Sequence, residues 1–429
     1  MGRTWASPCN PLLIASVCRQ WREIALALKP IWSKFEVSTD SAAPSPVGTF
    51  FEYWLPRAGT HPLEVSLFYA DHSAVLTLLQ PYLAQLETLE CVAEDRIGFP
   101  NELLQGKIPN LRSLRLTCEK EITELITTFV DCPQLRELCL FSLPSAGMVG
   151  LAMPWDRLTR LDLIEMSLEE SLSILRQTPA LQTLAANGRN PTQEFSRATT
   201  FMCLPQLHTL NLNHFHRSLH VLEYCQPRLL AHLTLPALTH IEFPLDPRPQ
   251  SSYIIGITDP GLLATFVARS KCTLRSITLY TPSCGEAVGC LQAAGWTVTD
   301  VNLRNVSRNT GNLGYLLDHM RDTVVFVPNL TSLSINPCLG AIEIPFGWLA
   351  SVLAMRRDKL KRFELVIAGQ RTDSIVRRPS LVQKEDGGLD ALWALKRDGV
   401  RIDIRGLHNI TETVDPLAVY PPMPPPHDD

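Results

Sequence analysis

Ile108–Leu116 has the sequence IPNLRSLRL, and Cys132–Leu140 repeats its pattern as CPQLRELCL. Both stretches follow the order L-x-x-L-x-L, with a proline two residues before the first leucine. The last two leucines are two residues apart, so they point to the same face of a short β-strand. The first leucine is expected to fill the same interior from the preceding turn. The pattern therefore predicts a strand with one buried face.

The same pattern recurs along most of the chain at nearly regular intervals. The first four steps between its leading leucines are 24, 23, 23 and 26 residues. A period of roughly 20–29 residues with this pattern is the signature of leucine-rich repeats. The clear copies lead with Leu111, Leu135, Leu158, Leu181, Leu207, Leu238, Leu274 and Leu330. Weaker copies, and a last strand-like piece, begin at Leu86, Val298, Leu360 and Val400.

The segments between the strands carry the spacing of helices. In Cys118–Cys132 the apolar residues Ile122, Leu125, Ile126 and Phe129 recur every three or four positions. One strand and one helix cannot bury a core alone, whereas stacked repeats can. We therefore expect an α/β leucine-rich-repeat solenoid of horseshoe shape. The alternative is an α/β domain with leucine-rich strands.

The repeats depart from the common pattern in two ways. The position three residues after the last leucine is often asparagine, which satisfies backbone groups at the turn. In this chain the asparagine position holds other residues, as at Glu119, Leu143, Met166, Arg189 and Phe215. In addition, insertions such as Pro244–Gly261 lengthen the later repeats and predict loops on one rim.

Composition limits the class of protein. The chain has 429 residues, of which 45% are hydrophobic and 19% charged, as in globular proteins. Its net charge of −4 argues against binding nucleic acid through phosphate neutralisation. The 12 cysteines form no C-x-x-C pair, which predicts reduced thiols in the cytoplasm or nucleus. No apolar run approaches the ~18 residues that a membrane span needs, so no membrane association is expected.

The opening stretch VCRQWREIALALKPIW, Val17–Trp32, differs from the repeats. A helix is predicted to begin at Asn10–Pro11 and to end at Lys29, because Pro30 follows. Ile31–Val37 then predicts a short turn and a strand. The helix carries one apolar stripe, formed by Leu13, Val17, Trp21, Ile24 and Leu28.

This opening stretch resembles the C-terminal half of an F-box, as found before leucine-rich repeats in many fungal proteins. Phe51–Leu67 also resembles the segment that follows the F-box in mushroom-type members. The F-box likeness covers about the first thirty-five residues. It rests on Val17, Cys18, Trp21, Arg22, Ala25, Pro30 and Trp32.

The resemblance implies a substrate-recruiting subunit of a cullin-type (SCF) ubiquitin ligase. Such a subunit binds a Skp-type adaptor, which links it to the cullin. Family members normally begin with a leucine-proline helix, which MGRTWASPCNP does not contain, so a shortened gene product or a degenerate box is expected. The alternatives are an N-terminal cap of the solenoid and a stand-alone interaction scaffold. The residues expected to contact the adaptor are Leu13, Val17, Trp21, Ile31 and Trp32.

A target protein is expected to bind the concave strand face of the solenoid. The positions between the template leucines point to that face and carry both signs of charge. This mixture favours a protein surface over a polyanion. The candidate residues are Arg115, Glu137, Arg160, Asp162, Asn211, Glu242, Arg362 and Glu364.

No motif predicts catalysis, a metal or a cofactor. His208, His214, His216 and His220 cluster in sequence, but no glutamate or thiol completes a metal set. No nucleophile elbow and no phosphate-binding glycine loop is present, so we expect a binding protein rather than an enzyme. The predicted organisation has four parts. These are an F-box-like segment at 1–36, a connecting segment at 37–80, repeats at 81–408 and a Pro-rich disordered tail at 409–429.

Overall fold

The structure is a computed structural model, and the chain forms two compact units. Unit 1 comprises Met1–Arg197 with His216–Tyr224, and unit 2 comprises Ala198–Phe215 with Cys225–Asp429. The residues that the structure describes are 11–38, 47–68, 72–93, 101–118, 125–142, 150–188, 201–212, 227–244, 260–280, 284–306, 311–322, 325–337, 346–367, 388–408 and 412–414.

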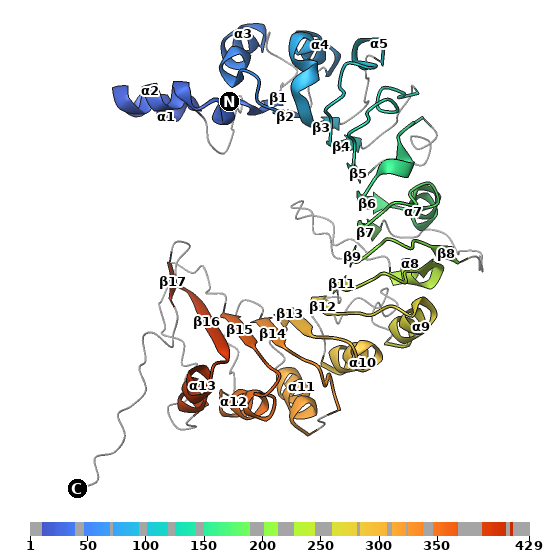
Figure 1. Cartoon of the computed structure of the whole chain (residues 1–429), viewed down its shortest axis with the longest axis vertical. Helices are drawn as coiled ribbons and strands as arrows, with labels where there is room; N and C mark the ends of the chain where they lie inside the picture. The colour runs from blue at the N-terminus through green and yellow to red at the C-terminus, as the bar shows by residue number, and fades with distance from the viewer. Residues whose placement is uncertain are drawn as a thin grey trace. The chain divides into compact units, whose positions relative to one another are not determined.

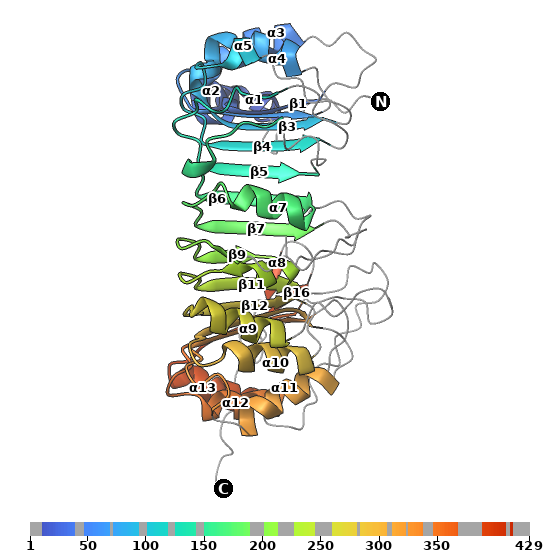
Figure 2. The same cartoon turned by 90° about the vertical axis from the view of Figure 1, so that its right-hand side faces the viewer.

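Unit 1 is built on parallel strands that pair in chain order, each with the next (Figure 2). The template leucines set this register: Leu89, Leu114, Leu138, Leu161 and Leu184 are direct Cα partners, and all are buried. The strands are β1 (Lys34–Ser38), β2 (Leu63–Phe68), β3 (Leu86–Ala93), β4 (Ser113–Cys118), β5 (Glu137–Phe141), β6 (Arg160–Met166) and β7 (Thr183–Gly188).

The helices of unit 1 connect successive strands, and α3, α4, α5 and α7 lie along one face of the sheet (Figure 1). Helix α7 begins at a capping box, in which Ser167 and Glu170 satisfy each other's backbone N–H groups. The helices are α1 (Pro11–Val17), α2 (Arg19–Ala27), α3 (Val47–Ala58), α4 (His72–Leu78), α5 (Asn101–Leu104) and α7 (Leu168–Leu175). The 3-10 turns are η1 (Lys29–Trp32), η2 (Gln80–Gln85) and η3 (Trp155–Arg157).

The helix predicted within Cys118–Cys132 is absent from its described part, residues 125–132. Ile126 instead forms an isolated parallel bridge with Leu151, and Phe129 is buried in the turns that follow. Leu125 is 56% exposed, and Ile122 lies outside the described residues. The apolar spacing correctly predicted that Ile126 and Phe129 are buried. The backbone of Ile126, however, pairs with another strand-like residue instead of forming a helix.

Unit 2 repeats the same architecture, with parallel strands from β9 to β16 and helices between them (Figure 1). Its strands are β9 (Thr209–Asn211), β11 (His240–Pro244), β12 (Ser276–Tyr280), β13 (Asp300–Val306), β14 (Ser332–Pro337), β15 (Arg362–Ile367) and β16 (Arg401–His408). Its helices are α8 (Pro227–His232), α9 (Pro260–Ser270), α10 (Cys284–Ala294), α11 (Gly311–Asp322), α12 (Phe346–Met355) and α13 (Gly388–Arg397).

Two short additions complete unit 2. Strands β8 (Met202–Cys203) and β10 (Leu233–Thr234) form a separate parallel pair. Strand β17 (Glu412–Val414) runs antiparallel to β16 and falls within the predicted Pro-rich tail. The remainder of that tail lies outside the described residues.

Threonine hydroxyls reinforce the hydrogen bonds between neighbouring repeats where several strands begin. A threonine directly after the first template residue donates its Oγ1 to the carbonyl of the equivalent residue one repeat earlier. The backbone N–H of the same threonine donates to the same carbonyl. The donors are Thr159, Thr239, Thr299 and Thr331, with Oγ1–O distances of 3.4, 3.1, 3.2 and 3.1 Å.

Each unit is thus an α/β leucine-rich-repeat solenoid, which confirms the fold predicted from the sequence. The strand predicted within Ile31–Val37 is β1, preceded by the 3-10 turn η1. Because β1 and β2 pair in the same sheet as β3, parallel strand pairing begins at Lys34.

Candidate functional site

The N-terminal helical segment is two helices rather than the single helix that the sequence predicts. Cys18 has φ −158° and ψ 175°, an extended conformation that separates α1 from α2. The Arg22 Nε donates to the Ala15 carbonyl at 2.9 Å, which ties α2 back to α1. Helix α2 ends at Ala27, two residues before the predicted end, because the turn η1 begins at Lys29. An extended residue at position 18 folds the two helices against each other.

Two tryptophans fix this segment to helix α3. The Trp32 indole N–H donates to the Ala25 carbonyl at 2.7 Å, which joins η1 to α2. The Trp54 indole N–H donates to the Trp32 carbonyl at 2.7 Å, which joins η1 to α3. The two rings pack edge to face, with centroids 4.9 Å apart. The Arg57 guanidinium lies 5.3 Å from the Trp32 ring centroid. The segment is therefore held in one geometry.

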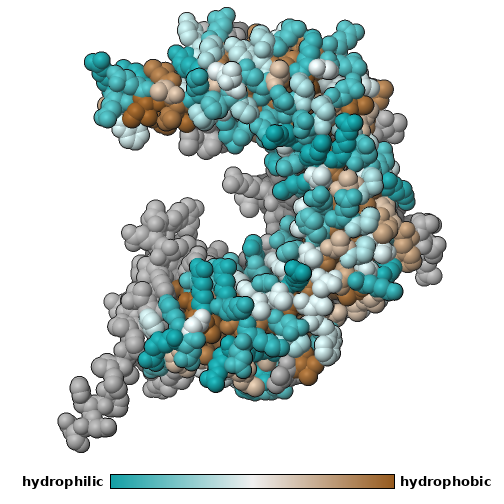
Figure 3. All heavy atoms as spheres, in the orientation of Figure 1, coloured by the Kyte–Doolittle hydropathy of each residue, from teal (hydrophilic) through white to brown (hydrophobic). Residues whose placement is uncertain are grey.

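Although it is held firmly, the segment exposes most of its apolar side chains. Only Pro11 of α1 and Ala25 of α2 are buried. Figure 3 shows the hydrophobic side chains gathered on these two helices. We call the following side chains the exposed apolar set: Leu12, Leu13, Val17, Trp21, Ile24, Leu26 and Leu28, which are 45–67% exposed. Large exposed apolar patches on soluble proteins mark binding surfaces.

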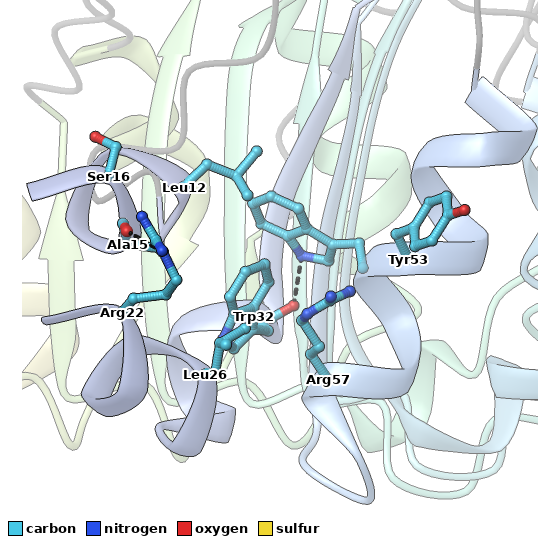
Figure 4. Close-up of a pocket in the computed structure, with 9 residues that line it drawn as sticks. Leu12, Ala15, Ser16, Arg22, Leu26, Trp32, Tyr53 and Arg57 are labelled. Carbon is cyan, nitrogen blue, oxygen red and sulfur yellow. Dashed lines mark hydrogen bonds between the residues drawn. The ribbon is translucent and has the colours of Figure 1, made fainter. Parts of the chain in front are cut away.

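A cavity of about 550 Å³ opens beside the exposed apolar set (Figure 4). Its walls come from α1, α2, η1 and α3, and aromatic and aliphatic groups dominate them. Two guanidinium groups, from Arg22 and Arg57, are the cationic groups of the lining. The lining residues are Leu12, Ala15, Ser16, Arg22, Leu26, Trp32, Tyr53, Trp54 and Arg57. The lining is chemically complementary to an apolar group that lies next to a negatively charged group.

The five residues predicted to contact an adaptor fall into two groups. Leu13, Val17 and Trp21 belong to the exposed apolar set. Ile31 is partly exposed, and Trp32 is 1% exposed, so its ring serves the core and one wall of the cavity. The sequence reasoning missed Leu12, Leu26, Tyr53 and Arg57. The segment FEYWLPRA, Phe51–Ala58, was the available signal for Tyr53 and Arg57, because Tyr53 precedes Trp54 directly and Arg57 follows it by three residues.

In unit 1 the predicted partner-binding residues lie on the sheet face opposite the helices. Arg115 and Asp162 flank Cys139 in one row of Cα partners, and Glu137 pairs with Arg160 in another. Arg160 also forms an ion pair with Asp162, with Nε 3.5 Å from Oδ1. Asp162 is buried, while Glu137 and Arg160 are exposed. The structure therefore brings all four predicted residues of this unit together.

The row also contains Glu90, which the sequence reasoning missed. Arg115 Nη1 lies 3.3 Å from Glu90 Oε1, and the Ser66 hydroxyl donates to Glu90 Oε2 at 2.9 Å. Burial lowers the pKa of Arg115, but the neighbouring Cys139, Glu90 and Asp162 outweigh it and raise the pKa above its usual value. Glu90 occupies the same template position as Arg115, so its position in the weaker Leu86 copy was the available signal.

Cys139 stands at the centre of this row without being a nucleophile. Burial, together with the nearby Asp162 and Glu90, raises the pKa of the Cys139 thiol to about 12, although Arg115 opposes the change. A thiol in this state stays protonated at physiological pH and reacts slowly. The row therefore combines charged side chains with a buried thiol that stays protonated.

In unit 2 the predicted residues occupy the equivalent face but are spread along it. Asn211 and Glu242 are direct Cα partners. Arg362 and Glu364 lie two residues apart on β15 and form an ion pair at 3.0 Å. The strands β12 to β14 separate the two residue pairs, so the pairs lie at two distinct locations on this face.

Metal and membrane sites were not expected from the sequence. Among the residues that the structure describes, no three His, Cys, Asp or Glu side chains gather as a metal site would require. His208 is exposed, and its Nδ1 forms a hydrogen bond with the Thr209 hydroxyl. His214, His216 and His220 lie outside the residues that the structure describes. None of the described helices has the length and apolar character to cross a bilayer.

Comparison of the sequence with protein-family models gave no match, and neither did comparison with curated proteins. Among solved structures, the chain is similar to one from the Toll–Spatzle complex, described as a molecular hub in Drosophila development and innate immunity. The two share 11% sequence identity, with a TM-score of 0.29. The alignment covers 79% of this chain and 50% of the other, so this chain spans half the length of its match.

Proposed function

We propose that this repeat protein recruits a target to a cullin-type ubiquitin ligase, with the α1–α2 segment docking on a Skp-type adaptor. One observation carries the proposal: six apolar side chains of α1 and α2, with Leu28 directly after α2, are exposed on a segment that is itself fixed in place. A protein partner that covers them removes apolar surface from water, which favours association. The resemblance of Val17–Val37 to half of an F-box supplies the identity of that partner.

The alternative reading, in which this segment only caps the solenoid, accounts less well for the exposure. A cap buries its apolar face against the first repeat. Here α1 and α2 bury only Pro11 and Ala25. Their apolar side chains face solvent, as a surface prepared for a partner does. A stand-alone scaffold without an adaptor leaves this surface without a role.

The repeats supply the second half of the proposed function. The sheet faces opposite the helices present mixed charges in fixed rows, such as Glu90, Arg115 and Asp162 in unit 1. Extended surfaces of this kind are what repeat proteins use to hold partners. In this proposal the chain acts in the cytoplasm or nucleus, needs no cofactor and performs no chemistry itself.

The test is binding of the purified Skp-type adaptor by isothermal titration calorimetry. The decisive variant is Leu13→Asp with Val17→Asp, which places two carboxylates in the exposed apolar set. We expect binding to weaken about 100-fold, because buried charges without partners are costly at an interface. The matched control is Leu78→Asp with Leu125→Asp, two leucines of unit 1 that are 41% and 56% exposed.

The control is expected to bind the adaptor as the unaltered chain does. Circular dichroism of each variant serves as the control that it remains folded. Failure of the folded, unaltered chain to bind the adaptor rejects ligase coupling and leaves the stand-alone scaffold. Equal weakening by both pairs of substitutions rejects the α1–α2 surface as the docking site.

A further inference from the structure

Cations from three separate turns of the sequence lie on one edge of unit 2, where the strands begin. Hydrogen bonds between repeats place Arg275 and Lys361 in one row, three repeats apart: Thr299 N–H donates to Arg275 O, Thr331 N–H to Thr299 O, and Lys361 N–H to Thr331 O. Arg401 N–H continues the series by donating to Lys361 O at 3.0 Å. We call the following exposed side chains the basic edge: Arg275, Arg357, Lys359, Lys361 and Arg397.

An exposed tryptophan lies within this edge. Lys359 Nζ donates to the Pro328 carbonyl at 2.9 Å, and the neighbouring Asn329 Nδ2 donates to the Trp296 carbonyl at 2.8 Å. These bonds join the turns of three successive repeats. The Trp296 side chain is 70% exposed. Tryptophan is enriched at the centres of protein–protein interfaces, where its burial contributes strongly to affinity.

Several of these cations have no ion-pair partner within the described part of the chain. Arg362 is paired with Glu364, and Arg401 with Asp403, but both pairs lie on the strands. Among described carboxylates, none forms an ion pair with Arg275, Lys361 or Arg397. Figure 3 views unit 2 from this side and shows hydrophilic side chains gathered over it.

We propose that the basic edge of unit 2 binds a carboxylate-rich segment of the target protein, with an apolar side chain of that segment packed on Trp296. This rests on the proposed function, and it names the surface and the chemistry that hold the target. Neighbouring strands lie about 4.8 Å apart, so the three strand steps from Arg275 to Lys361 span roughly 14 Å. An extended peptide covers that distance in about four residues.

A peptide fits this edge better than a nucleic acid does. Asp300, Asp358 and Asp398 interrupt the row of cations and repel a continuous polyphosphate. A protein segment can place its carboxylates between them and set an apolar group against the indole.

The test uses two fluorescein-labelled peptides of twelve residues, glutamate throughout except for a central phenylalanine or, in the matched peptide, alanine. Binding is followed by fluorescence anisotropy at low and high salt. We expect Arg275→Glu with Lys361→Glu and Arg397→Glu to weaken binding at least tenfold at low salt, where charge attraction is least screened. Lys107→Glu with Arg157→Glu and Arg176→Glu, three exposed cations of unit 1, should change binding less than about twofold.

Trp296→Ala should remove the preference for the phenylalanine peptide and leave the alanine peptide unaffected. The proposal is overturned by no measurable binding, by equal weakening in both triple variants, or by a phenylalanine preference that persists in Trp296→Ala. A 12-nucleotide single-stranded DNA that binds tenfold tighter than either peptide, and that needs the same three cations, assigns the edge to nucleic acid instead. None of these substitutions lies in α1 or α2. Adaptor binding, measured separately, therefore tests the proposed function, and peptide binding tests the basic edge.

Discussion

At the scale of single residues, two arginines join neighbouring repeats of unit 2 through backbone carbonyls. Arg269 donates to the carbonyls of Leu230 and Leu233, at the end of α8 and the start of β10. Arg356 donates to those of Met320, Phe326 and Val327, at and after the end of α11. The last carbonyls of a helix have no partner within it, so each guanidinium satisfies groups that burial would otherwise leave unpaired.

Replacement of Arg356 tests this role. Arg356→Met should lower the free energy of unfolding by about 2–4 kcal/mol, because it leaves several partly buried carbonyls without donors. Arg357→Met is the matched control: its side chain is exposed and lies 3.9 Å from Asp358, so the loss should stay below about 0.5 kcal/mol. Urea unfolding followed by circular dichroism measures both. Equal losses in the two variants would show that the contacts of Arg356 add nothing beyond a surface charge.

Burial of Cys139 makes a prediction for alkaline stability. The folded chain raises the pKa of this thiol from 9.0 to about 12, chiefly through desolvation. The folded state therefore keeps its proton while the unfolded state loses it, so this contribution to stability is complete below pH 9 and is lost as the pH rises to about 12. In that window Cys139→Ala should reduce the pH slope of the unfolding free energy by up to about 1.4 kcal/mol per pH unit.

The control for the alkaline experiment is Cys203→Ala, at an exposed cysteine of unit 2. Urea unfolding at pH 8 to 11 gives the slope for each variant, and the Cys203 variant should match the unaltered chain. A slope that is the same in all three chains would mean that Cys139 titrates alike in the folded and unfolded states.

At the scale of elements, helix packing depends on one close contact between glycines. A Cβ added to Gly388, at the start of α13, would lie 2.2 Å from the Gly347 nitrogen and 2.4 Å from the Phe346 carbonyl carbon. Both atoms belong to the backbone of the first turn of α12, so a larger residue forces the two helices apart.

Gly388→Ala should therefore destabilise unit 2 by about 1–3 kcal/mol, as overpacking of a tight contact does. Gly285→Ala is the control, because a Cβ there meets nothing within 4 Å and α10 gains helix propensity. Thermal unfolding should show a lower midpoint for the first variant and an equal or higher midpoint for the second. A midpoint unchanged by Gly388→Ala would mean that α12 and α13 separate without cost.

Elements were predictable where the leucine pattern alone decides them. The strands of the main sheet follow the template from β3 to β16, because two apolar residues at a spacing of two define a strand face. The short pair β8 and β10 lies outside the template. Helices were less predictable, since the spacing at 125–132 fits a helix or a turn with the same buried residues. The break at Cys18 carried no local signal, because neither glycine nor proline marks it.

At the scale of the molecule, the sites were harder to predict than the fold. The sequence indicated that residues such as Trp21 and Trp32 were special, but it did not show which one faces solvent. Contacts over 22 residues, such as Trp54 with Trp32, decide that. The sequence analysis missed the basic edge because Arg275 and Arg397 lie about 120 residues apart, and only folding brings their turns to one side of the sheet. The cation-rich segment RRDKLKR, residues 356–362, was the available signal.

The division into two units predicts how stability is distributed. In a solenoid each repeat contacts only its neighbours, so a local defect spreads a limited distance. Phe363 is fully buried in β15, and Phe363→Ala should cost about 3–5 kcal/mol. Hydrogen exchange followed by mass spectrometry should show faster exchange in β14, β15 and β16, while β3 and β4 keep the protection of the unaltered chain.

The reciprocal variant is Leu114→Ala, at a fully buried leucine of β4. It should raise exchange in β3, β4 and β5 and leave β14 to β16 protected. Exchange that rises evenly in both units, in either variant, would show that the chain unfolds as one cooperative body. Local loss in each case means that helices α1 and α2 of unit 1 and the basic edge of unit 2 can be altered independently. The binding experiments on the two surfaces need this independence.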